Sequence, residues 1–99
     1  MSIQNNTQMK IKELRAKGRL LEPSIRLGKN GITDSIIDEI KKRLKKESLI
    51  KVKMLNNFSE KQNKKQAAVE LAEKTGSVLV DQVGFVVVLL KKDDAKKDR

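Results

Sequence analysis

Residues 24–39 read Ser-Ile-Arg-Leu-Gly-Lys-Asn-Gly-Ile-Thr-Asp-Ser-Ile-Ile-Asp-Glu, and this stretch decides the fold. A short apolar strand leads into a Gly-x-x-Gly loop at residues 28–31, and the loop opens directly onto a helix. A helix that begins after such a loop presents backbone N–H groups and the positive end of its dipole to an anion. The stretch therefore predicts an α/β unit with a phosphate-sized anion site at the turn from strand to helix.

The composition indicates that the anion bound at this site is a phosphate of nucleic acid. The chain has 99 residues, with 23 Lys+Arg against 13 Asp+Glu and a formal net charge of +10. Phe58 and Phe85 are the two aromatic residues, so the core is expected to consist of Ile, Leu and Val. Base stacking needs aromatic side chains, and the sequence therefore favours structured RNA read by shape over unpaired bases read by stacking.

The chain lacks the residues that most catalytic and metal sites use. It has no Cys and no His, which excludes disulfides, thiolate metal sites and the commonest general base. Asp34, Asp38 and Glu39 are better explained by helix capping and surface charge than by acid–base chemistry or magnesium. No apolar run approaches the roughly 20 residues of a membrane span. We expect a soluble, cytoplasmic, non-enzymatic protein with no catalytic residue, metal or cofactor and no membrane partner.

The first half of the chain is expected to form two helices and two strands. The first helix would begin at its cap, Thr7, and stop at Gly18. A strand at residues 24–27 precedes the glycine loop, and Thr33 caps the second helix, whose apolar residues recur at helical spacing. Residues 49–55 alternate between apolar and basic side chains, which is typical of a strand with one buried face.

The second half is expected to form a third helix and a hairpin. Ser59 and Gln62 read as a capping box at the start of this helix, and Gly76 closes it. Residues 77–83 would form the third strand and the apolar run at 85–90 the fourth. Apolar residues on both faces are typical of a central strand covered on both sides. Either the first helix or a partner could cover the second face.

The expected order is helix–strand–helix–strand–helix–strand–strand. It corresponds to an α/β fold, a two-layer sandwich with a four-stranded mixed sheet and at least one right-handed parallel crossover. Residues 7–92 would form a single domain, and residues 1–6 and 93–99 would be flexible termini.

The segments 27–33, 47–53 and 83–89, with Ile40 between the first two and Thr-Gly at 75–76, together resemble the CRM domain. This family is named for chloroplast RNA splicing and ribosome maturation, and the length is similar to its stand-alone prokaryotic form. The resemblance implies a fold similar to the C-terminal domain of translation initiation factor three, with strand order 1-2-4-3. It also implies RNA binding through the glycine loop, and association with 23S-type ribosomal RNA or precursors of the large ribosomal subunit.

The predicted RNA-binding residues surround the glycine loop. Glycines permit positive φ and let a phosphate approach closely, and their replacement is expected to weaken RNA binding with little loss of thermal stability. Arg26, Lys51 and Lys53 are expected to share one face of the sheet. The predicted contact residues are Gly28, Lys29, Asn30 and Gly31 in the loop, Arg26 before it, Lys12, Arg15, Lys17 and Arg19 in the first helix, and Lys41, Lys42 and Lys45 in the second helix.

Other functions remain open from the sequence. A small basic chromatin protein of archaeal type, which coats DNA as a dimer, fits the charge equally well, and only the loop–strand–hairpin pattern argues against it. An enzyme acting on RNA would have to work without His, Cys or an acidic cluster with metal spacing. A module that binds only protein is a third alternative, and the oligomeric state is left open.

Overall fold

The chain folds into the expected α/β arrangement. A computed structural model describes residues 3–92. Of the termini expected to be flexible, residues 1–2 and 93–99 lie outside the described residues, whereas residues 3–6 belong to the first helix. The elements in chain order are α1 (Ile3–Leu20), β1 (Ile25–Leu27), α2 (Asp34–Glu47), β2 (Leu49–Met54), the short 3-10 helix η1 (Lys61–Asn63), α3 (Lys64–Thr75), β3 (Ser77–Val83) and β4 (Val86–Lys91).

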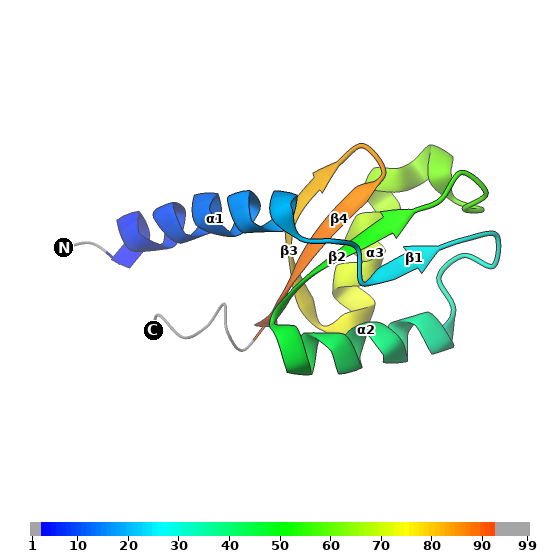
Figure 1. The fold of residues 1–99 in the computed structure, drawn as a ribbon, viewed down its shortest axis with the longest axis horizontal. Coiled ribbons are helices and arrows are strands. Elements are labelled where there is room, and N and C mark those ends of the chain that lie inside the picture. Colours follow the sequence, from blue (N-terminus) through cyan, green and yellow to red (C-terminus); the bar gives the residue numbers. More distant parts are fainter. Residues whose placement is uncertain (1–2, 93–99) are drawn as a thin grey trace.

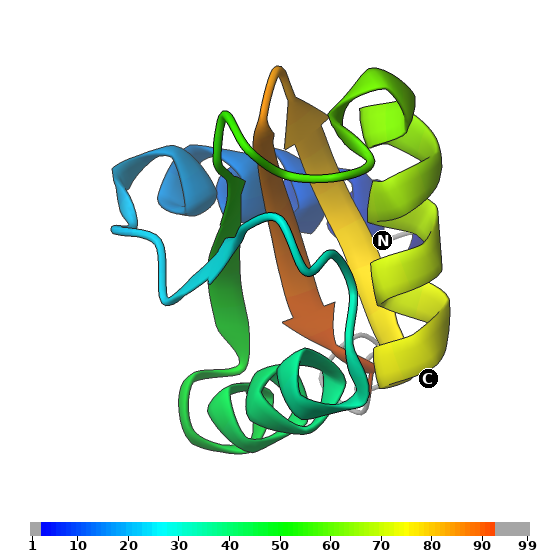
Figure 2. The same cartoon turned by 90° about the vertical axis from the view of Figure 1, so that its right-hand side faces the viewer.

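The sheet has the strand order β1-β2-β4-β3, as the CRM resemblance implied. β1 pairs with β2 in parallel, with Ile25 opposite Val52, and the other neighbouring strands are antiparallel. A parallel pair needs a long crossover connection, and α2 provides it. The sheet separates α1 on one side from α2 and α3 on the other (Figures 1 and 2).

The main core lies between the sheet and the two helices α2 and α3. Alternate residues of the strands point into it, including Val52 and Leu89, which are fully buried. The small side chains of Ala67 and Ala68 let α3 approach the sheet closely. The expectation that Ile, Leu and Val alone fill the core was wrong, because Phe58 and Met54 are also buried there, each with 2% of its surface exposed.

The other face of the central strand is covered by α1. Val88 and Leu90 of β4 form a second apolar cluster with Val80 of β3, and Leu14 of α1 packs against it. The run of apolar residues in β4 is therefore explained, since one set of side chains faces α3 and the alternate set faces α1. The sequence left open whether the first helix or a partner covers this face, and in the structure α1 covers it at this cluster.

Gly18 does not end the first helix as expected. The helix begins at Ile3 and continues to Leu20, and Gly18 is a buried residue within it. A Cβ atom at this position would lie 2.9 Å from both Cγ atoms of Val88, closer than non-bonded carbon atoms approach one another. Gly18 is therefore the position at which α1 comes into close contact with β4.

Two of the expected helix caps, Thr33 and Gly76, are confirmed, whereas Thr7 lies within α1 and does not begin it. Thr33 caps α2, because its hydroxyl accepts a hydrogen bond from the Ile36 N–H at 3.2 Å. Gly76 ends α3 in the left-handed conformation, with φ of 63°. The prediction of a capping box at Ser59 and Gln62 was wrong. α3 begins at Lys64, directly after η1 in the chain, and its N-cap Asn63 makes no side-chain hydrogen bond. The turn at η1, in which the Asn63 N–H donates to the Glu60 carbonyl at 2.9 Å, separates Ser59 from the helix start.

The remaining differences are small. The strands expected at residues 24–27, 49–55 and 85–90 each shift or shorten by one residue at an end. No helix within residues 3–92 combines the length and the apolar character needed to cross a lipid bilayer.

The contact at Gly18 gives a test of how α1 is attached. We expect Gly18→Leu to lower the free energy of unfolding by about 1–3 kcal/mol, because the new side chain meets Val88 in a packed interface. Ala16→Leu on the same helix is the matched control, since Ala16 is exposed and its replacement should change stability by less than about 0.5 kcal/mol. Chemical denaturation of both variants measures the difference, and equal stabilities would show that α1 does not pack at Gly18.

Candidate nucleic-acid interface

The Gly28–Gly31 loop is a tight turn with one obligatory glycine. The Gly31 N–H donates to the Gly28 carbonyl at 3.0 Å, which closes the turn. Gly31 has φ of +74°, and a Cβ there would lie 2.8 Å from the Ser59 hydroxyl oxygen. Gly28 has no positive φ, and a Cβ there would only reach ordinary contact with Asn57, at 3.5 Å. The expectation that both glycines can be replaced without loss of stability is therefore wrong for Gly31.

The turn exposes a cation next to the start of α2. Lys29 and Asn30 are exposed at its tip, whereas Gly31 is buried beneath them. The first N–H groups of a helix have no partner within the helix, and Thr33 satisfies only that of Ile36. Lys29 and the positive end of the α2 dipole thus lie close together in the chain, as an anion site requires.

Other segments meet the loop at the same end of the sheet. The Leu55 N–H donates to the Leu27 carbonyl at 2.8 Å, which places the connection after β2 beside the loop. Figure 2 views this end, with both connections towards the reader. The connection continues through η1 to the start of α3, where Lys64 and Lys65 line a polar hollow of about 320 Å³. Several parts of the chain therefore contribute to this end, which we call the loop end.

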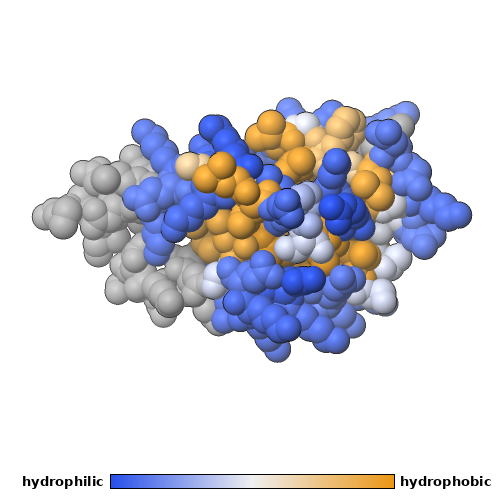
Figure 3. Space-filling model, viewed as in Figure 1, coloured by the Kyte–Doolittle hydropathy of each residue, from blue (hydrophilic) through white to orange (hydrophobic). Residues whose placement is uncertain are grey.

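The lysines of α2 extend a basic surface away from the loop end. Lys41, Lys42 and Lys45 are exposed, and the surface over α2 is strongly hydrophilic (Figure 3). Near the end of α2, four lysines border a hollow of about 220 Å³ beside Thr75 and Gly76. They are Lys41, Lys45, Lys91 and Lys92.

The helices beside this hollow carry two ion pairs, and neither of them includes the four lysines. The ion pairs on the neighbouring helices join Arg43 to Glu47 at 3.0 Å and Lys74 to Glu70 at 2.8 Å. The hydrogen bond to Glu70 and the charge of that carboxylate raise the pKa of Lys74. The ammonium group of Lys74 is therefore already paired with a carboxylate. Within residues 3–92, no carboxylate forms an ion pair with the four lysines of the hollow.

The cations of α1 lie elsewhere than the sequence suggested. Lys12, Arg15, Lys17 and Arg19 are all exposed, but α1 crosses the sheet face opposite α2. The Arg15 side chain donates from Nε to the Val80 carbonyl in β3, at 3.3 Å. Lys17 borders a hollow with Glu47 and Ser48, at the far end of α2 from the glycine loop. Proximity in sequence to the loop therefore does not bring these side chains to it.

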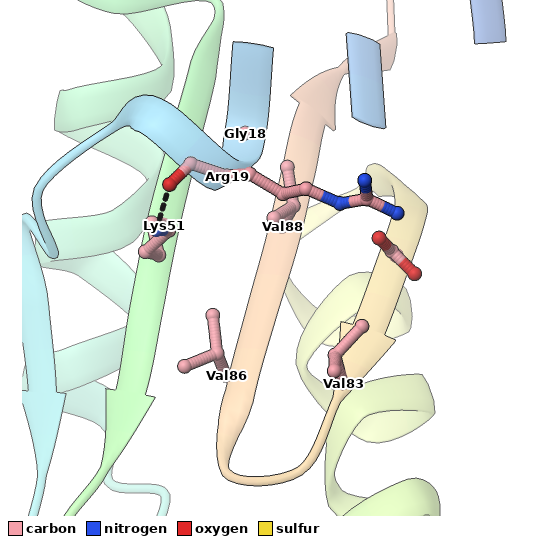
Figure 4. A pocket seen from close by; sticks show the side chains of 7 residues that line it. Gly18, Arg19, Lys51, Val83, Val86 and Val88 are labelled. Atoms are coloured by element: carbon pink, nitrogen blue, oxygen red, sulfur yellow. Dashed lines mark hydrogen bonds between the residues drawn. The ribbon is translucent and has the colours of Figure 1, made fainter. Parts of the chain in front are cut away.

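The outer face of the sheet carries the three cations expected to share it. Arg26 is directly opposite Lys53 in the β1–β2 pair, and Lys51 lies two residues along on the same face. Lys51 also lines a hollow of about 200 Å³, shown in Figure 4, whose other walls are largely valine side chains and Gly18. Its ammonium donates to the Arg19 carbonyl at 3.2 Å, which ties the end of α1 to β2. This hollow is a seam between α1 and the sheet.

Comparison with known proteins identifies the family of this chain. The CRS1 / YhbY (CRM) domain model matches residues 7–91, which is most of the chain. The chain belongs to the CRM domain family. The Probable RNA-binding protein YqeI of Bacillus subtilis is 36% identical over 84 residues, with 85% of each chain covered.

Further relatives of this CRM domain come from archaea and bacteria. The Probable RNA-binding protein MJ0652 of Methanocaldococcus jannaschii is 36% identical over 78 residues, which are 79% of this chain and 58% of that longer protein. The solution structure of the hypothetical protein SAV1595 from Staphylococcus aureus has a TM-score of 0.69 and 35% identity, and 83% of each chain is covered. The fold of this CRM domain is therefore that of a solved relative.

The three carboxylates that the sequence raised as acid–base or magnesium candidates all lie on α2. Asp34, Asp38 and Glu39 are exposed on α2. Among residues 3–92, no group of three or more His, Cys, Asp or Glu side chains is arranged to hold a metal ion.

Sequence reasoning missed Lys64, Lys65 and Phe85 at the loop end. They are far from the glycine loop in the chain, and only the β2–β4 pairing and the position of η1 bring them to this end of the sheet. The signal that could have found them is the strand order, which places the start of β4 next to the end of β2.

The two glycines of the loop should respond differently to replacement. We expect Gly31→Ala to lower the free energy of unfolding by about 1–2 kcal/mol, because a side chain at positive φ is strained and this one also meets Ser59. Gly28→Ala should change stability by less than about 0.5 kcal/mol. Denaturant unfolding of the two variants measures this, and equal effects would contradict the geometry of the turn.

Proposed function

We propose that this CRM domain binds structured RNA and that the Gly28–Gly31 loop holds a backbone phosphate at the start of α2. The observation that carries the proposal is the tight turn at residues 28–31. Gly31 is buried with a left-handed φ, Lys29 and Asn30 are exposed at its tip, and α2 begins three residues later. Backbone N–H groups with a neighbouring ammonium group are suited to a phosphate. The relatives named as probable RNA-binding proteins support RNA as the ligand.

The basic surface along α2 supports an extended contact with the RNA backbone. Lys45 lies about 16 Å along the helix axis from Asp34, at 1.5 Å per residue. The lysine-lined hollow at that distance gives a second place for a phosphate, and release of counterions would supply affinity without reading the base sequence. The RNA backbone would follow α2 from the loop to this hollow.

The biological role we propose is assembly of the large ribosomal subunit in the cytoplasm, with 23S-type ribosomal RNA or pre-ribosomal particles as the partner. The family's association with ribosome maturation supports this role. The protein would act by binding alone, because a chain without His or Cys lacks the groups most often used for catalysis on RNA.

The salt dependence of binding tests the loop. The logarithm of the affinity for a structured RNA should fall linearly with the logarithm of the salt concentration. Lys29→Gln should reduce the slope by about 0.7–0.9, which corresponds to the loss of one phosphate contact. Fluorescence anisotropy over a series of salt concentrations measures the slope.

Arg43→Gln is the matched control for this experiment. It removes the same unit charge, but the Arg43 guanidinium is already paired with Glu47, so the slope should be unchanged. Equal reductions in both variants would mean that the loop makes no particular contact. Tighter binding to duplex DNA than to structured RNA at matched salt would contradict RNA as the ligand.

A further inference from the structure

Hydrogen bonds place Phe85 in line with the glycine loop across the sheet. The Met54 N–H donates to the Phe85 carbonyl at 2.7 Å, and the Leu55 N–H donates to the Leu27 carbonyl at 2.8 Å. The end of β1, the end of β2 and Phe85 therefore lie side by side at one rim of the sheet. Because neighbouring strands are about 4.8 Å apart, the Phe85 backbone lies about 10 Å from that of Leu27, where the loop begins.

The side chain of Phe85 is exposed at this rim although it is aromatic. Its exposed fraction is 44%, whereas the other aromatic residue, Phe58, is 2% exposed and lies in the core. The turn before β4 does not require it, because Gly84 supplies the positive φ of 57°. The conformation of the hairpin thus leaves this exposed ring unexplained.

A cation lies over the ring on the helix side of the sheet. The Lys64 ammonium at the start of α3 is 4.8 Å from the centre of the Phe85 ring. This contact fixes the ring on the same side of the rim as the glycine loop, which leads into α2. An aromatic face, a cation and a phosphate-binding turn are the elements that single-stranded nucleic-acid sites combine.

We propose that Phe85 is a stacking platform for one unpaired base, next to the phosphate held by the Gly28–Gly31 loop. The inference rests on the proposed RNA-binding function and specifies the ligand further, as structured RNA with an unpaired nucleotide beside its helix. Stacking on an aromatic ring depends little on which base is present. The platform would therefore select an unpaired position and not a base sequence.

Two synthetic RNA hairpins test the proposal: one fully paired in its stem, and one identical except for a single unpaired adenosine. Phe85→Ala and Phe85→Leu should each weaken binding to the second hairpin by roughly 5- to 150-fold, because a stacked base is lost. Binding to the first hairpin should change by less than about 2-fold. Phe85→Trp should keep or improve binding to the hairpin with the unpaired base.

The tryptophan variant also gives a direct signal. The natural chain has no Trp and no Tyr, so Phe85→Trp introduces the single indole fluorophore. Its emission should be quenched by the hairpin with the unpaired base and much less by the paired one. Val69→Trp, at a 47% exposed position on α3, is the control and should show no such difference. Thermal unfolding of each variant confirms that it is folded.

The outcomes separate this inference from the proposed function. If Phe85→Ala binds both hairpins as the natural protein does, or loses affinity for both alike, Phe85 is not a stacking platform. Indole emission of the Phe85→Trp variant that does not distinguish the hairpins leads to the same conclusion. If the natural protein binds neither hairpin, RNA binding itself is wrong. Selective loss in Phe85→Ala with rescue in Phe85→Trp supports the platform.

Discussion

The parallel pairing of β1 with β2 is the constraint on which the rest of the structure depends. Parallel neighbours cannot be joined by a tight hairpin, so the chain must leave the end of β1, cross the sheet and return to the start of β2. α2 is that crossover, and it buries Ile40 and Leu44 against the sheet. The turn between β1 and α2 therefore lies at the carboxyl end of a parallel strand, beside the connection that leaves β2. In open α/β sheets this is where ligands generally bind. The position of the proposed anion site follows from this topology.

The central strand β4 gives the domain its second constraint. Its side chains alternate between the core with α2 and α3, where Val87 lies, and the cluster beneath α1, where Val88 lies. A strand that is apolar on both faces requires cover on both, and Gly18 lets α1 come close enough to supply it. α1 is thereby held on the outer face, away from the glycine loop. The same packing that stabilises the sheet separates the cations of α1 from those of α2, and divides the basic surface between two faces.

Much of the fold could be predicted from residues in local patterns, and most of what was missed depends on contacts between distant segments. Thr33 and Gly76 cap their helices because side-chain type and backbone conformation decide the matter locally. The prediction of a helix stop at Gly18 is wrong because Gly18 is needed for contact with Val88, which lies 70 positions later in the chain and cannot be recognised from the neighbouring residues. Ser59 was read as a cap because the burial of Phe58 and the intervening turn are tertiary effects. The candidate site follows the same division: the loop was visible in the sequence, whereas Lys64 and Phe85 reach it only through the strand order.

The central claim is that the loop end, and not the outer face of the sheet, receives the RNA backbone. Amide chemical shifts of the ¹⁵N-labelled protein, followed during titration with a structured RNA hairpin, test it most directly, because every non-proline residue reports on its own position. The account predicts the largest shifts at residues 28–34, with smaller ones along the exposed side of α2. Shifts concentrated at Arg19, Lys51 and Val86 on the outer face, with the loop unchanged, would contradict it.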